Sequence, residues 1–166
     1  MTTPVIRVST AYTRPYAFVA VAPTSALEER FDVALEWRPY TLRIEEYLGA
    51  VETRTEHSWR RVRYSYMDAR RFANRQGLTL KGPTRVYNGY YANAGMLFAE
   101  RAGIFRAYND AVFEQFWKRA LDLDVLAEMS ALVDRIGGDA AAYEAYAEGP
   151  GRAEMDAVIT EAETLG

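Results

Sequence analysis

The chain has 166 residues, of which 49% are hydrophobic and 26% are charged. This length and composition fit one folded domain and exclude a disordered tail. The formal net charge of −3 does not favour nucleic-acid binding. No apolar run approaches the roughly 20 residues that cross a membrane. The N-terminus has no basic segment followed by an apolar one, so we expect no signal peptide and a cytoplasmic location.

Few residues of the kinds that bind metals or act as nucleophiles are present. The chain contains no cysteine, and His57 is its only histidine. Disulfide exchange by the chain's own thiols is therefore excluded, and we expect no metal site. Asp122 and Asp124, two residues apart beside a helix start, fit helix capping better than paired acid–base catalysis.

The first 40 residues predict a strand–helix–strand (βαβ) unit. Residues 4–9 are rich in β-formers and predict a strand. A helix follows from Pro15 to Arg30, with Thr13 as its expected cap and proline in its first turn. Residues 31–37 alternate and predict a second strand, parallel to the first. One face of this second strand would carry Phe31, Val33, Leu35 and Trp37.

After Pro39 the patterns predict helices alone. In chain order these are a short helix at 41–50, a long one from Ser58 to Gln76, one from an Asn93 cap to Gly103, one over 104–120, one capped by Asp124, and two over 139–148 and 150–165. We therefore take residues 1–40 as the βαβ half and 41–166 as one helical unit.

Charge is distributed unevenly along the chain. Residues 54–85 hold nine Arg or Lys against two acids, whereas residues 139–166 hold seven acids against Arg152 alone. The simplest interpretation is solvated helix faces with ion pairs between the two regions. The alternative is an anion-binding surface within 54–85.

The order of these segments resembles the DsbA-type branch of the thioredoxin fold, in particular the kappa-class glutathione transferases and the 2-hydroxychromene-2-carboxylate isomerases. The matching segments are "RPYAFVA", against a family pattern Ser-Pro-Tyr-x-Tyr-Leu-Ala, "LEWRPY", "SWRRVRYSYMDARRFANRQGL", "VYNGYYANAGMLFAERAG" and "IFRAYNDAVFEQFW". The resemblance covers almost the whole chain. It implies a thioredoxin-like α/β fold with a large all-helical insertion. The family continues with a cis-proline strand where this sequence stops, so the C-terminal strands are expected to be missing.

The same resemblance implies a glutathione site at the start of the first helix. Arg14 stands where the family has a serine that stabilises the glutathione thiolate, so Arg14 and Thr13 are the candidate catalytic residues. The candidate residues for binding glutathione are Pro15, Tyr16, Arg60, Arg61 and Asn88. A helix N-terminus stabilises anions, and arginine adds a full charge and planar donors. Arginine is also bulky enough to fill the thiol pocket, which would leave the site inactive.

The function implied by the resemblance is a glutathione-dependent isomerase or transferase. It would add a bound thiolate to a small aromatic carboxylate and release the isomer. The alternatives are a catalytically inactive scaffold or binding protein, which homodimerises through helix faces bearing Phe, Tyr and Trp, and a redox-inactive relative of the oxidoreductases. We expect a homodimer with neither nucleic acid nor membrane as a partner. The segment "YNGYY" at 87–91 fits an aromatic-substrate pocket or ordinary core packing.

Overall fold

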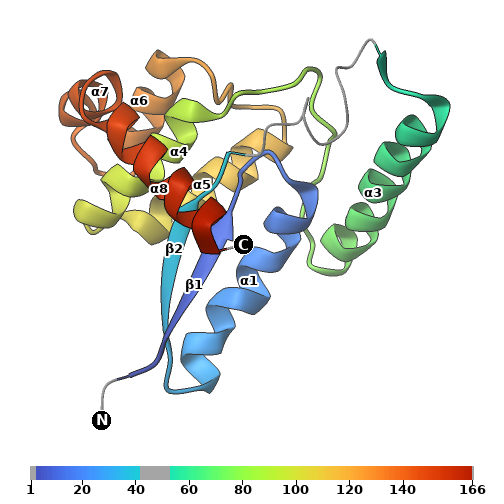
Figure 1. The fold of residues 1–166 in the computed structure, drawn as a ribbon, viewed down its shortest axis with the longest axis horizontal. Coiled ribbons are helices and arrows are strands. Elements are labelled where there is room, and N and C mark those ends of the chain that lie inside the picture. Colours follow the sequence, from blue (N-terminus) through green and yellow to red (C-terminus); the bar gives the residue numbers. More distant parts are fainter. Residues whose placement is uncertain (1–2, 42–52, 166) are drawn as a thin grey trace.

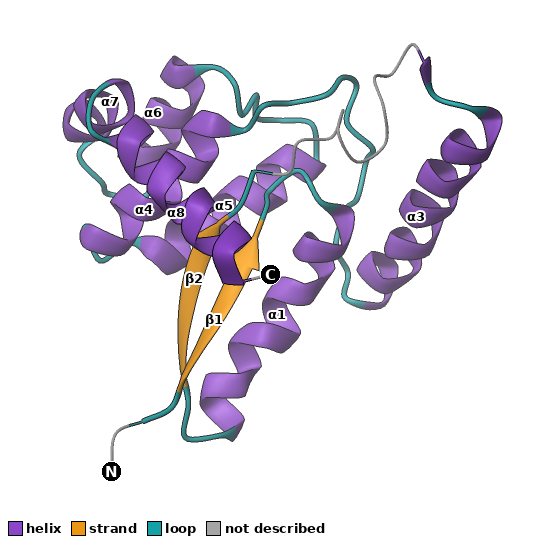
Figure 2. Cartoon of the chain, viewed as in Figure 1, coloured by secondary structure: helices purple, strands orange, loops and turns teal. Residues whose placement is uncertain are grey.

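A two-stranded parallel sheet lies against a set of helices in the computed structural model, which describes residues 3–41 and 53–165 (Figures 1 and 2). The predicted βαβ unit is formed by β1 (Val5–Thr10), α1 (Pro15–Arg30) and β2 (Ala34–Pro39). Val5 lies opposite Ala34 and Thr10 opposite Pro39, in parallel register. The short helix predicted at 41–50 lies outside the described residues, apart from Thr41.

β2 begins later than the alternating pattern predicts. Phe31 is not a strand residue but the C-cap of α1, and its backbone N–H donates to the Leu27 carbonyl. Its side chain is 55% exposed, so it does not share a buried face with Trp37. Trp37 is buried and its ring centroid lies 5.9 Å from that of Phe105. The prediction over 31–37 is wrong at its start because alternation alone does not distinguish a helix cap from a strand.

The helices after β2 cover most of the remaining chain. Their bounds are α3 (Glu56–Arg75), α4 (Tyr90–Arg101), α5 (Phe105–Trp117), α6 (Leu126–Arg135), α7 (Ala140–Glu148) and α8 (Gly151–Leu165). None of the described helices is long and apolar enough to cross a membrane.

Three predicted helix caps are wrong. Arg14, not Thr13, is the N-cap of α1, and its side chain makes no capping bond. α4 is preceded by Gly89 in the left-handed region, at φ 71°, so Asn93 lies inside the helix. Its side-chain nitrogen donates to the Thr41 hydroxyl at 2.8 Å. Val125 precedes α6, because the Asp124 carboxylate is already bound by the loop before α4.

One hydrophobic core joins the βαβ unit to the helices. The ring of Phe18 in α1 stacks on Trp117 of α5 at 6.1 Å between centroids, and Tyr12 lies 4.7 Å from Phe113. α8 returns to the sheet, where its Glu161 forms a 2.7 Å ion pair with Arg7 of β1 (Figure 1). The described helices after β2 thus share one core with the βαβ unit.

The acids of 139–165 do not pair with α3, in contrast to the predicted ion pairs between the two regions. Glu148 lies 3.5 Å from Arg152, Glu154 pairs with Arg101, and Glu161 pairs with Arg7. These partners are closer in the fold because α8 runs along α4 and β2.

Candidate functional site

The turn between β1 and α1 places Thr13 and Arg14 at the carboxyl end of the parallel strands, the edge at which open α/β sheets bind ligands. The backbone N–H of Arg14 donates to the Ala11 carbonyl at 3.1 Å, which closes the turn. Pro15 then takes the first helical position, where no N–H is needed. Because Arg14 makes no side-chain cap, the N-cap offers no acceptor to the N–H groups of the first turn.

A cavity of about 10 Å³, room for one water molecule, lies against this turn. The lining residues with polar side chains come from three separate segments and are Tyr12, Thr13, Tyr40, Thr41, Tyr87, Asn88 and Asn93. The structure therefore brings Thr13 and Asn88 together. Gly89 lies beside Thr13, where an added Cβ would be in ordinary contact at 3.6 Å from the threonine methyl group, and glycine is favoured there by its φ of 71°.

Asn88 is held in place by the loop's own hydrogen bonds. Its backbone N–H donates to the Asp124 carboxylate at 3.2 Å, and its side-chain oxygen accepts from the N–H of Tyr90 at 3.1 Å. Asp124 also accepts from the N–H of Gly89 at 2.7 Å and binds Arg85 at 2.7 Å. Asp122 accepts from the same Arg85 at 2.8 Å and from the N–H of Asp124 at 3.0 Å. Both carboxylates thus fix the loop of the site, and neither is the N-cap of α6.

Arg14 lies near Tyr66 of α3, together with two more arginines. Burial raises the pKa of the Tyr66 hydroxyl, while the positive charges of Arg14, Arg54 and Arg70 oppose that rise. Arg70 also donates to the Leu80 carbonyl at 3.1 Å. The positive charges of three arginines therefore act on one hydroxyl. We call Arg14, Arg54, Arg70 and Tyr66 the arginine cluster.

The sequence analysis predicts Arg14 as a site residue but not Arg54, Arg70 or Tyr66. Arg54 and Arg70 fall within the basic stretch 54–85, which offered a general signal for anion binding but not which residues face Arg14. Tyr66 and Arg70 are four residues apart and so share one side of α3. That side contacts Trp117 of α5 and the Leu80 carbonyl, which depends on tertiary packing.

The other predicted binding residues do not line the cavity. Tyr16 is 43% exposed, and its hydroxyl donates to Asp68 of α3 at 2.8 Å. Arg60 pairs with Glu56 one turn earlier on the exposed surface. Arg61 is also exposed and makes no ion pair within the described part of the chain. The binding roles of these three residues stay predictions.

A family model described as a DSBA-like thioredoxin domain matches residues 5–164. The chain belongs to this family. Among solved structures, a 2-hydroxychromene-2-carboxylate isomerase has a similar fold, with a TM-score of 0.77 and 19% sequence identity over 95% of this chain and 78% of that chain. A search of the curated proteins finds no significant match. The predicted membership of the DsbA-type branch and the predicted thioredoxin-like fold class are confirmed.

This DSBA-like domain has no cysteine with which to exchange disulfides. Within residues 3–41 and 53–165 there is also no group of three or more His, Asp or Glu side chains placed to hold a metal ion. The chemistry that the helix start offers is instead that of an anion site, because guanidinium groups and first-turn N–H groups both attract negative charge.

Proposed function

We propose that this DSBA-like protein is a glutathione-dependent isomerase or transferase that acts on a small aromatic carboxylate through a bound thiolate. The observation that carries the proposal is Arg14 at the N-cap of α1, at the carboxyl end of β1, where its positive charge acts on Tyr66 together with those of Arg54 and Arg70. The similar fold of a 2-hydroxychromene-2-carboxylate isomerase supports this choice of reaction class.

The donor set suits the anionic groups of glutathione. Guanidinium groups bind carboxylates and other anions through paired N–H donors. The cavity beside Thr13 and Asn88 holds only one water and does not admit a tripeptide. Glutathione would therefore lie over the outside of the α1 start, with its anionic groups toward the arginine cluster.

Bound glutathione supplies a sulfur nucleophile, and the chain's own residues have three tasks. Arg14 favours the ionised thiol, because a positive charge at a helix N-terminus lowers the free energy of an anion there. Tyr66 is protonated at neutral pH because the ordinary pKa of tyrosine is about 10 and burial raises it further, so its hydroxyl can donate a hydrogen bond to an anion. Arg54 and Arg70 orient the carboxylate of the substrate.

The test is an isothermal titration of reduced glutathione into the wild-type protein. We expect saturable binding with a Kd of about 1 mM or tighter, or roughly −4 kcal/mol. Arg14→Ala should weaken binding at least about tenfold, a loss of about 1.4 kcal/mol. Arg30→Ala, at the other end of α1, is the matched control and should leave the affinity unchanged.

S-methylglutathione separates the thiol from the rest of the peptide. If Arg14 binds the thiolate, S-methylglutathione should bind the wild type more weakly than glutathione does. The two peptides should bind Arg14→Ala with equal affinity. A folded wild-type protein that gives no saturable heat with glutathione would contradict the proposal. The inactive scaffold would then be the better description of this protein.

A further inference from the structure

The turn after α5 contains an arginine in the left-handed region. Arg119 has φ 62° and is the one non-glycine residue with a positive φ among residues 3–41 and 53–165. Its backbone N–H donates to the Phe116 carbonyl at 2.9 Å. The N–H of Ala120 donates to the Gln115 carbonyl at 2.8 Å, which completes a Schellman motif. Glycine is the usual residue at this position, because a Cβ is unfavourable there. Three other described helices are followed by a glycine in this conformation, at Gly77, Gly103 and Gly137.

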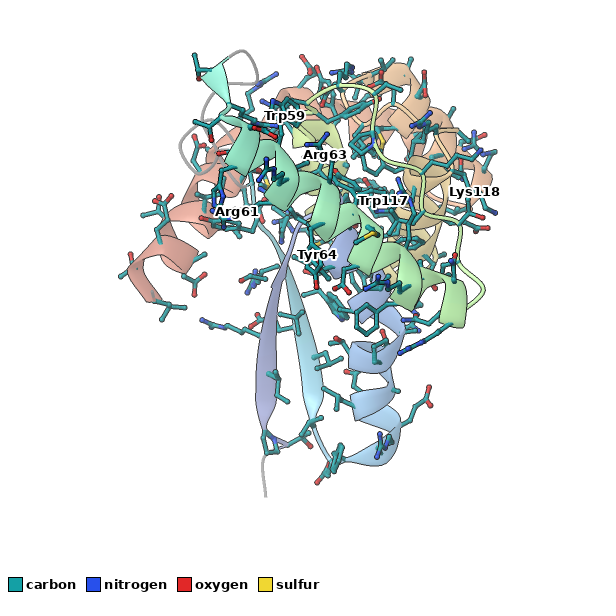
Figure 3. The ribbon with its side chains drawn as sticks, turned by 90° about the vertical axis from the view of Figure 1, so that its right-hand side faces the viewer. Trp59, Arg61, Arg63, Tyr64, Trp117 and Lys118 are labelled. Carbon is teal, nitrogen blue, oxygen red and sulfur yellow. The ribbon has the colours of Figure 1, made fainter. Side chains whose placement is uncertain are left out.

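The side chain of Arg119 gives a reason for an arginine at this position. Its Nε donates to the Gly82 carbonyl at 2.7 Å. The backbone N–H of Lys81 donates to the Trp117 carbonyl at 2.8 Å. Trp117 and Lys118, which Figure 3 labels, lie at the end of α5. We call residues 80–82 the strap. Two hydrogen bonds tie the strap to the end of α5, and a glycine at position 119 would keep only one of them.

The strap also contacts α3, at two members of the arginine cluster. The Nε of Arg70 donates to the Leu80 carbonyl at 3.1 Å. A Cβ added to Gly82 would lie 3.7 Å from the ring of Tyr66 and 3.8 Å from a terminal nitrogen of Arg70. The side chain of Leu80 is buried, which anchors the strap in the core. The strap therefore connects Arg119 with the guanidinium group of Arg70.

The position of Arg70 depends on this strap. Arg70 forms no ion pair within residues 3–41 and 53–165, and the Leu80 carbonyl is its one hydrogen-bond partner there. This bond uses Nε and leaves the two terminal nitrogens as donors for an anion. Burial raises the pKa of the Tyr66 hydroxyl and the charge of Arg70 opposes that rise, so the guanidinium group acts at the cluster. A side chain that is already held loses less conformational entropy when a ligand binds.

We propose that Arg119 is a positioning residue, which holds the strap on α3 and thereby fixes the guanidinium group of Arg70 for binding an anion. The effect on ligand binding rests on the proposed function, whereas the order of Arg70 can be measured without a ligand. The alternative is that Arg119 only ends α5. Glycine distinguishes these two roles, because it favours the left-handed turn and removes the bond to the strap.

The test measures both order and binding in the full chain. NMR of protein with isotope-labelled arginine follows hydrogen exchange of the Arg70 Nε–H, which is assigned with Arg70→Lys. In Arg119→Gly this exchange should be at least about fivefold faster, because the strap is less firmly held. The urea midpoint of Arg119→Gly should equal or exceed that of the wild type. Its Kd for reduced glutathione should rise at least about threefold, because Arg70 then becomes ordered only on binding.

Three further variants complete the comparison. Arg119→Lys keeps a charged donor and should restore part of the protection and of the affinity. Arg119→Asn tolerates a positive φ but lacks the long donor, so it should repeat the glycine result and replaces that variant if it does not fold. Lys118→Ala is the matched control. Lys118 is exposed and pairs with Glu114, so its removal should leave exchange and Kd unchanged.

Failure of this proposal and failure of the proposed function give different results. If the wild type binds glutathione, a folded Arg119→Gly with an unchanged Kd overturns the positioning role. A weaker Kd with unchanged Arg70 exchange also overturns it, because Arg119 then acts on the ligand itself. If the wild type does not bind glutathione, the proposed function fails and exchange alone decides: faster exchange in Arg119→Gly supports the positioning of Arg70, and unchanged exchange overturns it.

Discussion

The rings of Tyr12 and Tyr108 meet edge to face in the core, with centroids 6.3 Å apart, yet only one of the two hydroxyl groups has a hydrogen-bond partner among the described residues. The Tyr108 hydroxyl donates to the Ala92 carbonyl at 2.8 Å. The Tyr12 hydroxyl is equally buried but has no hydrogen-bond partner among the described residues. Because Tyr12 directly precedes Thr13 and Arg14, this pair links the candidate site to the centre of the helices.

Removing these two hydroxyls should therefore have different effects. Tyr108→Phe loses a buried hydrogen bond and leaves the Ala92 carbonyl without that donor, which should lower the free energy of unfolding by about 1–2 kcal/mol. Tyr12→Phe removes a buried hydroxyl without a partner and should leave stability unchanged or raise it slightly. Urea denaturation of both variants measures the difference, and equal losses would contradict it.

Stability should fall at alkaline pH because of the buried tyrosines. Burial raises the pKa of Tyr12, Tyr108 and Tyr143 above the ordinary value of about 10. A folded-state pKa above the unfolded value means that stability is complete below pH about 10 and is lost as pH rises further. The loss should reach about 1.4 kcal/mol per pH unit for each tyrosine.

Urea denaturation between pH about 8 and about 11 measures this dependence. Tyr108→Phe should reduce the slope above pH 10, since one of the titrating hydroxyls is gone. An unfolding free energy that is flat across this range in the wild type would show that these hydroxyls ionise as readily in the folded state as in the unfolded one.

The loop that carries Asn88 should depend on Asp124. Its carboxylate accepts from the N–H groups of Asn88 and Gly89 and binds Arg85. Asp124→Ala should cost about 1–3 kcal/mol, because two backbone donors lose their acceptor and Arg85 keeps only the carboxylate of Asp122. Asp110→Ala removes an exposed pair with Arg106 and should cost less than about 0.5 kcal/mol. Similar costs for the two variants, measured by thermal or urea unfolding, would contradict the role given to Asp124.

Gly95 in α4 should tolerate no larger residue. A Cβ at this position would lie 2.0 Å from the Tyr108 hydroxyl oxygen and 2.5 Å from the adjacent ring carbon. Because the ring is fully buried and its hydroxyl is bonded, we expect Gly95→Ala to cost about 1–3 kcal/mol despite the helix propensity of alanine. Tyr108→Leu in the same chain should recover part of that loss, and a stabilising Gly95→Ala in urea unfolding would refute the packing described.

Local patterns predict the βαβ unit and the long helices, because strand alternation, Pro15 at a helix start and the apolar spacing of α3 are properties of neighbouring residues. The starts of β2 and α4 are harder to predict from the sequence. Phe31 ends α1 in an extended conformation and Gly89 precedes α4 in the left-handed region, and neither follows from the pattern of apolar residues. The sequence resemblance pointed to Arg14. It did not reveal that the charges of Arg14, Arg54 and Arg70 act together on Tyr66, because that depends on how α3 packs in the fold.

The most direct test of the account is the ionisation of glutathione bound to this protein. The ultraviolet absorbance of the thiolate is followed against pH for saturated wild type and for Arg14→Ala. A free thiol has a pKa of about 8.5. If Arg14 and the helix start stabilise the anion, the pKa of the bound thiol should be at least about one unit lower in the wild type. In Arg14→Ala it should return toward the free value. A bound thiol that titrates like free glutathione in both proteins would contradict the central claim that Arg14 marks a thiolate site.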